Sequence, residues 1–303
     1  MRMAKAVDQE LNTVVAHLQQ LDPQGTRTAT VLRDTLDQLY DGLHTGRYRW
    51  DQLHKTEKTH CGTLVEINLH REFDFDDGIA MDYRIAGIDV DCKYSQTMGG
   101  WMIPPESMGH LCVVVTADDP NATWSMGVVR IHEDILTAGG NRDAKKTISA
   151  VGRQSIQWIF HNAALPPNVL LLLPRPTVDA LMALPNGQQR IDQIFRVAQC
   201  QRIGRGVIAT LGQQDDYMKR VRYNGGSRSR LQPEGIVILG HYDGHKHIAQ
   251  ALGIPVPGRG ESVGVRLAPA AKAGAGVATI SGKLWRVATA ADPVVAAPDC
   301  PHA

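Results

Sequence analysis

No stretch of this 303-residue chain stays apolar for long enough to cross a lipid bilayer. The longest aliphatic run, Val169–Leu173, is far shorter than the roughly 20 residues that a membrane-spanning helix needs. The opening segment, MRMAKAVDQELN, contains no apolar core of the kind found in secretory signals. We therefore expect no membrane partner and a cytoplasmic location.

Motifs of several familiar enzyme classes are also missing. The five cysteines are scattered without a C-x-x-C pair, which is typical of free thiols in a reducing compartment. There is no G-x-S-x-G sequence and no complete Walker A motif, so neither a nucleophile-elbow hydrolase nor a P-loop nucleotidase is indicated. The formal net charge is only +1, so any affinity for nucleic acid must depend on how the charges are distributed.

The order of predicted elements indicates a mixed α+β protein. In the first half, helices are predicted over residues 4–22 and 28–40, within 145–161, and over 63–72, where the pattern is ambiguous and helix is favoured. Strands are predicted over 81–85, 87–94, 111–116 and 123–131. In the second half, helix-like stretches over 188–223 precede a strand at 236–239, a helix at 245–252 and strands near 263–267 and 277–287.

A domain boundary is expected between residues 162 and 176. This segment holds four of the sixteen prolines around a short aliphatic strand. We therefore expect a first domain over 1–162, a linker over 163–176 and a second domain over 177–303.

The most informative segment is MDYRIAGIDVDCK at residues 81–93. Folded as a hairpin with Ala86-Gly87 as its turn, it pairs residue 85 with 88, 84 with 89, 83 with 90, 82 with 91 and 81 with 92. Because side chains alternate along a strand, one face is then apolar and the other collects only charged residues. The charged face consists of Asp82, Arg84, Asp89, Asp91 and Lys93.

Two like charges face each other in this hairpin. Arg84 opposite Asp89 is a favourable pair, whereas Asp82 opposite Asp91 destabilises the ladder unless something compensates. A divalent cation bound by hard oxygen ligands would do so, and Lys93 points to the same side. Glu66 could add a third carboxylate if residues 63–72 form a helix that faces the hairpin. The alternative is a set of solvated surface charges.

These residues resemble the PD-(D/E)xK nuclease signature, with Met81 in place of its proline. The surrounding segments LDQLYDGLHTGRYRW (36–50), KTEKTHCGTLVEINLHREF (55–73) and IAGIDVDCKYSQTMGGWMIP (85–104) resemble the NaeI family of restriction endonucleases, and the similarity extends through most of the chain. The resemblance implies a MutH-like endonuclease domain followed by a winged-helix domain that binds a second, activating DNA site. It assigns the catalytic roles to Glu66, Asp82, Asp91 and Lys93.

The implied activity is Mg²⁺-dependent hydrolysis of double-stranded DNA at a palindromic site, expected to be GCCGGC, leaving 5′-phosphate ends. Mg²⁺ held by Asp82, Asp91 and Glu66 would neutralise charge and polarise a water, and Lys93 would orient or deprotonate that water or stabilise the charge at phosphorus. A palindromic target implies a homodimer, with two DNA sites for each functional dimer.

The second half carries a local excess of positive charge. Between residues 188 and 230 there are nine Lys and Arg residues against three Asp, which is the pattern expected for phosphate contacts. A helix-turn-helix with its recognition helix near 215–223 fits this segment, and a solvated basic helix is the alternative. The candidate DNA-binding residues are Lys219, Arg220, Arg222, Arg228 and Arg230.

Three other functions compete with the restriction endonuclease. A MutH-like nicking enzyme would share the metal site and cut one strand. A non-catalytic winged-helix regulator would bind DNA without a metal and never cut it. A ligase or topoisomerase is suggested by Leu39-Tyr40-Asp41-Gly42, which resembles the K-x-D-G ligase motif. Leu39 replaces the nucleophilic lysine there, so ligase chemistry is not expected.

Overall fold

The computed structural model describes residues 7–300, which form two compact units. The first unit contains the described residues up to Leu39 together with Leu53–Pro166, and the second contains Tyr40–Gln52 together with the chain from Pro167 onward. Among the helices of this part of the chain, none combines the length and the apolar character needed to cross a membrane.

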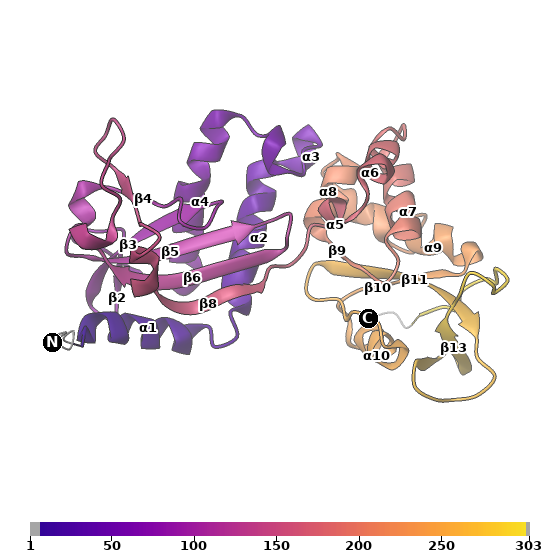
Figure 1. Ribbon diagram of the computed structural model, residues 1–303. Helices are drawn as coiled ribbons and strands as arrows, with labels where there is room; N and C mark the ends of the chain where they lie inside the picture. The colour runs from indigo at the N-terminus through magenta and orange to yellow at the C-terminus, as the bar shows by residue number, and fades with distance from the viewer. Residues whose placement is uncertain (1–6, 301–303) are drawn as a thin grey trace. The chain divides into compact units, whose positions relative to one another are not determined.

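A six-stranded sheet forms the centre of the first unit, in the order β1-β2-β3-β5-β6-β8 (Figure 1). Only β3 and β5 run parallel, and every other neighbouring pair is antiparallel. The strands are β1 (Asp76–Asp77), β2 (Tyr83–Ile85), β3 (Ile88–Ser95), β5 (Leu111–Asp118), β6 (Thr123–Arg130) and β8 (Gln157–Ala164). A separate two-stranded ribbon pairs β4 (Met102–Ile103) with β7 (Lys146–Thr147).

Three long helices accompany this sheet: α1 (Gln9–Leu21), α2 (Thr26–Tyr40) and α4 (Lys55–Phe73). The α1 helix packs along β6 and β8, and α4 packs against β3 (Figure 1). The β5 sequence LCVVVTAD is buried on both faces, as its nearly unbroken apolar run predicts for a central strand. Short 3₁₀ helices lie in the connections: η1 (Trp50–Gln52, in the second unit), η2 (Pro105–Ser107), η3 (Glu133–Ile135) and η4 (Gly152–Ser155).

The second unit combines helices with a sheet of five strands. Its strand order is β10-β11-β13-β12, and β9 also pairs with β11. The strands are β9 (Arg202–Gly204), β10 (Ile236–Leu239), β11 (Glu261–Pro269), β12 (Val277–Ile280) and β13 (Lys283–Val287). The helices are α3 (Gly42–Thr45), α5 (Val169–Leu172), α6 (Arg175–Met182), α7 (Gly187–Val197), α8 (Arg205–Gly212), η5 (Tyr217–Val221), α9 (Ser227–Leu231), η6 (Gln232–Glu234) and α10 (Asp243–Leu252).

The segment Tyr40–Gln52 is held within the second unit by close packing. A Cβ atom on Gly42 would lie 1.9 Å from the Thr210 Oγ1 atom, so only glycine allows α3 to approach α8 this closely. The Asn168 side chain also donates a hydrogen bond to the Tyr48 carbonyl at 3.0 Å. Leu39 is 6% exposed, and the left-handed residue Asp41 (φ 48°) separates α2 from α3. The Asp41-Gly42 pair thus has a structural role in the turn.

Most predicted elements are confirmed, and three predictions are wrong. Residues 63–72 lie within α4, and the four strands predicted in the first half are present. The helix expected within 145–161 is wrong, because this segment forms β7, η4 and the edge strand β8. The aliphatic run from Val169 forms α5 and not a strand, since the Asn168 side chain caps it by accepting from the Leu170 N–H. The predicted start of the first helix at residue 4 lies outside the described residues.

The third wrong prediction concerns residues 215–223. The expected recognition α-helix is absent there, and the segment forms the five-residue 3₁₀ helix η5. The Asp216 side chain does not cap this helix and pairs instead with Lys219. The first α-helix after η5 is α9, which begins at Ser227.

Candidate active site

The β2–β3 hairpin forms in the register that the sequence predicts. Tyr83 pairs with Val90, Arg84 with Asp89, and Ile85 with Ile88. The turn residues Ala86 (φ 51°) and Gly87 (φ 79°) both have positive φ, as a tight two-residue hairpin turn requires. The predicted pairing of residues 82 with 91 and 81 with 92 does not continue as a ladder. Instead, the Asp82 Oδ2 atom accepts a hydrogen bond from the Cys92 N–H at 2.8 Å.

One end of the charged face of the hairpin, with Asp82, Asp91 and Lys93, is partly or fully buried, whereas Arg84 on the same face is exposed. Asp91 is only 3% exposed, so this charged residue is as deeply buried as its two neighbours on the apolar face, Val90 and Cys92. The Ser107 hydroxyl, itself fully buried at the end of η2, donates to the Asp91 Oδ2 atom at 2.6 Å. Burying a carboxylate costs free energy, so a buried and hydrogen-bonded aspartate such as Asp91 indicates a functional site.

Lys93 lies between the two aspartates. Its ammonium group contacts the Asp91 Oδ1 atom directly and lies 3.4 Å from the Asp82 Oδ2 atom. It also donates to the Cys92 carbonyl at 2.9 Å. The positive charge that compensates the aspartate pair in this structure is therefore that of Lys93.

The α4 helix brings Glu66 to the same site. The Tyr83 hydroxyl donates to the Glu66 carbonyl at 2.7 Å, which ties α4 to β2. Glu66 and Asp82 line one pocket of about 250 Å³, together with His70, Asp77 and Tyr83. Glu66 on α4 thus lies beside the hairpin, at the position expected for a third carboxylate of the site.

The pKa values of these groups shift in opposite directions. Burial, and then the charge of Asp82, raise the pKa of Glu66. Burial and the contact with Asp82 also raise the pKa of Asp91. Burial alone would raise the pKa of Asp82, but its contact with Asp91, the hydrogen bond from the Cys92 N–H and the charge of Lys93 lower it below its ordinary value. Asp91 is therefore the member of the aspartate pair that takes up a proton first.

Lys93 stays charged in this environment. Burial disfavours its ammonium form, but the Asp91 and Asp82 carboxylates outweigh that effect and raise the pKa of Lys93 above its ordinary value. A lysine with a raised pKa is a poor proton acceptor at neutral pH. In this arrangement Lys93 supplies positive charge and hydrogen bonds.

All four predicted catalytic residues lie in this region, and sequence reasoning missed two neighbours. Ser107 follows Asp91 by sixteen positions and carries no sequence signal for its role. His70 could have been found, because it follows Glu66 by four positions and so lies on the same helix face.

Asp89 lies opposite Arg84 as expected, and its carboxylate accepts hydrogen bonds from the Ile79 and Ala80 N–H groups. Within residues 7–300, no three His, Cys, Asp or Glu side chains are grouped closely enough to form a ready-made metal site.

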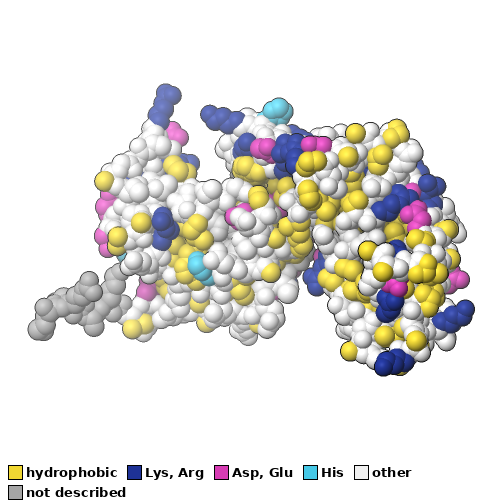
Figure 2. Space-filling view, turned by 45° about the vertical axis from the view of Figure 1, so that its right-hand side comes forward, with side chains coloured by type: hydrophobic (Ala, Val, Ile, Leu, Met, Phe, Trp, Pro, Cys, Tyr) yellow, Lys and Arg dark blue, Asp and Glu magenta, His cyan; other side chains and the backbone are white. Residues whose placement is uncertain are grey.

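The basic residues of the second unit differ in how they are engaged. Lys219 contacts Asp216, and the Arg220 guanidinium donates to the Gln214 side chain at 2.7 and 3.0 Å. Arg222 is exposed directly after η5. Figure 2 shows Lys and Arg side chains at several separate places on the displayed face of this unit, some of them beside acidic side chains. Arg228 and Arg230 both lie on α9.

Comparison with known proteins defines the class of the molecule. Residues 12–296 match a family model described as "Restriction endonuclease NaeI". The chain is also 50% identical, over 97% of its length and 95% of the relative's, to the type II restriction enzyme NaeI of Lentzea aerocolonigenes. These matches define a restriction endonuclease, a hydrolase that cuts DNA, and the mixed α+β fold is consistent with that class. The chain belongs to the NaeI family, which confirms the resemblance found in the sequence.

Proposed function

We propose that this protein is a type II restriction endonuclease that cleaves double-stranded DNA at a palindromic site, expected to be GCCGGC, by Mg²⁺-dependent hydrolysis. The observation that carries the proposal is the Asp82–Lys93–Asp91 group beside Glu66, in a chain that belongs to the NaeI family. The products would have 5′-phosphate ends. The palindromic target argues for a homodimer, because a two-fold symmetric site is matched by a two-fold symmetric protein.

The donor chemistry of this site fits Mg²⁺, although its three carboxylates are not gathered around one point in this structure. Asp82, Asp91 and Glu66 offer the hard carboxylate oxygens that this ion prefers. Burial and the neighbouring carboxylate raise the pKa values of Asp91 and Glu66, and a bound cation would oppose both effects by favouring the ionised carboxylates. When bound, the ion would supply charge neutralisation at phosphorus and polarise a water.

The protein's own side chains have separable tasks in this proposal. Ser107 and the Cys92 N–H fix the two aspartates, so the ligand oxygens are oriented before DNA binds. In the metal-free site the two aspartates raise the pKa of Lys93, so its ammonium group would position the attacking water or the scissile phosphate and balance the charge that develops there. Of the roles left open by the sequence, general base is therefore the one that the raised pKa of Lys93 disfavours.

The second unit is proposed to bind an additional, activating DNA site through a winged-helix arrangement. Its elements run helix α7, strand β9, helix α8, helix α9 and strands β10 and β11, with β11 between β9 and β10. This order and pairing are typical of winged-helix domains, and α9 then stands in the recognition-helix position. Each functional dimer would engage two DNA sites, with Lys219, Arg220, Arg222, Arg228 and Arg230 as the candidate contacts.

Plasmid cleavage tests the catalytic proposal. Supercoiled plasmid with several GCCGGC sites would be incubated with and without Mg²⁺, using wild-type protein and the variants Asp91→Ala and Lys93→Ala. We expect discrete double-strand fragments that require Mg²⁺ and disappear in both variants. Asp134→Ala, an exposed aspartate of the same unit, is the matched control and should cleave normally. Nicked circles alone would indicate a MutH-like enzyme, and intact but gel-retarded plasmid a non-catalytic regulator.

A further inference from the structure

The α9 helix turns its two arginines away from the core of the second unit. Its first and last residues, Ser227 and Leu231, are fully buried one helical turn apart. Between them, Arg228 is partly exposed and the Arg230 side chain is 50% exposed. The helix thus has one anchored face and one basic face.

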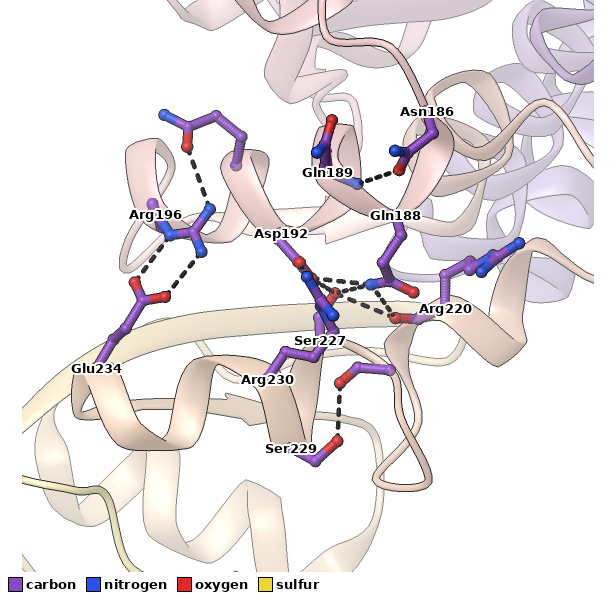
Figure 3. Close-up of polar contacts among 12 residues, drawn as sticks. Asn186, Gln188, Gln189, Asp192, Arg196, Arg220, Ser227, Ser229, Arg230 and Glu234 are labelled. Atoms are coloured by element: carbon purple, nitrogen blue, oxygen red, sulfur yellow. Dashed lines mark hydrogen bonds and ion pairs between the residues drawn. The ribbon is translucent and has the colours of Figure 1, made fainter.

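A buried carboxylate fixes this helix from the side of α7 (Figure 3). Asp192 on α7 is 1% exposed. Its Oδ1 atom accepts from the Ser227 hydroxyl at 2.6 Å and from the Gln188 amide at 2.8 Å. Its Oδ2 atom accepts from the Arg230 Nε atom at 2.7 Å. One aspartate therefore holds both the start of α9 and one of its arginines.

The other arginine of α9, Arg228, is held by a backbone carbonyl of β10 and by two tyrosine rings. The Arg228 Nε atom donates to the Ile238 carbonyl of β10 at 3.0 Å. Its guanidinium carbon lies 5.6 Å from the Tyr223 ring centre and 6.0 Å from that of Tyr242. A Cβ atom on Gly240 would come within 2.9 Å of an Arg228 Nη atom, so the glycine leaves room for the guanidinium.

Both arginines donate hydrogen bonds to the protein through the Nε atom. In the described part of the chain, no hydrogen bond joins the Nη atoms of Arg228 or Arg230 to a protein acceptor. Arg196 on α7 is different: its Nε and one Nη atom bind both oxygens of Glu234, and its other Nη atom donates to Gln193 (Figure 3). An arginine anchored through Nε keeps its paired Nη groups oriented for the oxygens of a phosphate.

We propose that α9 is the DNA-contacting element of the second unit, that Arg228 and Arg230 bind backbone phosphates of duplex DNA, and that Asp192 is the positioning residue for Arg230. This inference rests on the proposed second DNA site and specifies which residues form it. Lys219, whose ammonium group is paired with Asp216, and Arg220, whose Nε and one Nη atom both donate to Gln214, contribute less to this contact.

Binding of duplex DNA by the full-length protein in the presence of a chelator tests the proposal. Fluorescence anisotropy with a duplex that carries the site would be recorded at several salt concentrations. Arg230→Gln and Arg228→Gln should each weaken binding at the second site about tenfold and reduce the salt-dependence slope by about 1, as expected for one lost phosphate contact. Arg196→Gln removes the same charge from the same unit and should leave the slope unchanged.

The role of Asp192 is tested through its partner. Asp192→Asn keeps an acceptor for Ser227 and Gln188 but presents an amide donor to the Arg230 Nε atom. We expect a loss of affinity close to that of Arg230→Gln, and no further loss in the double variant, because the two residues act as one unit. A purely structural role of Asp192 would give additive losses and would leave the salt slope of Asp192→Asn unchanged. Circular dichroism would check that the variant folds; Arg230→Gln alters an exposed side chain and tests the site on its own.

The outcomes separate this inference from the function on which it rests. If the dimer binds two duplexes and only the α9 and Asp192 variants weaken binding of the second duplex, the result supports both the second DNA site and its assignment to α9. Two duplexes per dimer with unchanged affinity and slope in all these variants overturns the assignment to α9 and leaves the second DNA site standing. A dimer that binds one duplex, unaffected by the α9 variants, overturns both.

Discussion

Lys93 alone balances the repulsion between the two aspartates of the candidate active site in this structure. The sequence predicts that Asp82 and Asp91 repel each other and that something must compensate, and a metal ion was the expected solution. In the structure the ammonium group of Lys93 contacts both carboxylates. The lysine and a divalent cation therefore serve the same electrostatic need, and binding of the ion would redistribute the contacts of Lys93.

Ser107 gives a test of the support around Asp91. Ser107→Ala removes the hydroxyl that donates to a buried carboxylate oxygen, so that oxygen loses its partner. The unfolding free energy should fall by about 1–3 kcal/mol, and the cleavage rate should fall about tenfold or more because Asp91 is no longer oriented. Chemical denaturation and plasmid cleavage measure the two effects. Ser155→Ala, at an exposed position, should change neither; a Ser107→Ala enzyme with normal activity would contradict the orienting role.

Glu66 provides a pH-dependent prediction. Its folded-state pKa is raised above the ordinary 4.5, so the folded protein favours the protonated carboxyl, and ionisation costs stability as the pH rises through the folded pKa. In metal-free protein, Glu66→Gln should therefore raise the melting temperature at about pH 7.5, by on the order of 1–2 °C. The gain should vanish at a pH well below 4.5, where wild-type Glu66 is protonated too. Thermal unfolding at both pH values would reveal it, and a destabilised variant at neutral pH would refute the argument.

Sequence reasoning found side chains that share a periodic element and missed those brought in by the tertiary fold. Asp82, Asp91 and Lys93 were found because strand alternation places them on one face, and Glu66 because a helix carries it towards that face. Ser107 comes from a short 3₁₀ helix, where no periodic pattern relates it to Asp91. The buried partner Asp192 was counted only as a charge, since burial cannot be inferred from a single acidic residue.

Secondary-structure elements were predicted well where one physical signal dominated. The β2–β3 hairpin follows from strict alternation on both sides of a turn that contains glycine. The edge strand β8 was mistaken for a helix because its pairing with β6 has register shifts, and Asn162 adopts a left-handed conformation (φ 52°), so its pattern does not alternate cleanly. The α5 helix was mistaken for a strand because periodicity cannot distinguish a helix from a strand in so short a continuous aliphatic run, and only the Asn168 cap distinguishes it.

Two glycines on different helices should respond oppositely to the same substitution. Gly42→Ala would place a Cβ atom 1.9 Å from the Thr210 Oγ1 atom, so α3 would have to move away from α8, at a cost of about 1–3 kcal/mol. Gly62→Ala, in the middle of α4, meets no atom within 4 Å and should stabilise the protein by about 0.5–1 kcal/mol because alanine favours the helix. Urea unfolding compares the pair. Equal effects of the two substitutions would show that close packing of α3 does not matter.

Magnesium binding should be visible in the stability of the whole molecule, independently of cleavage. A ligand that binds only the folded state raises the melting temperature in proportion to the logarithm of its concentration once its sites are filled. Thermal unfolding without DNA should therefore show a Mg²⁺-dependent increase in wild-type protein and a smaller one in Asp82→Asn. Asp134→Ala should respond like the wild type. If Asp82→Asn responds fully, the ion is held elsewhere.

The membership of Tyr40–Gln52 in the second unit limits how this family can evolve by recombination. The chain leaves the first unit after Leu39, contributes α3 to the second unit, returns at Leu53 and leaves again after Pro166. A single crossover near residue 166 between two relatives would therefore combine one parent's α3 with the other parent's α8, where Gly42 and Thr210 meet with no room for a methyl group. Viable chimaeras are expected to inherit both segments from the same parent, so the two units should be passed on as a linked pair.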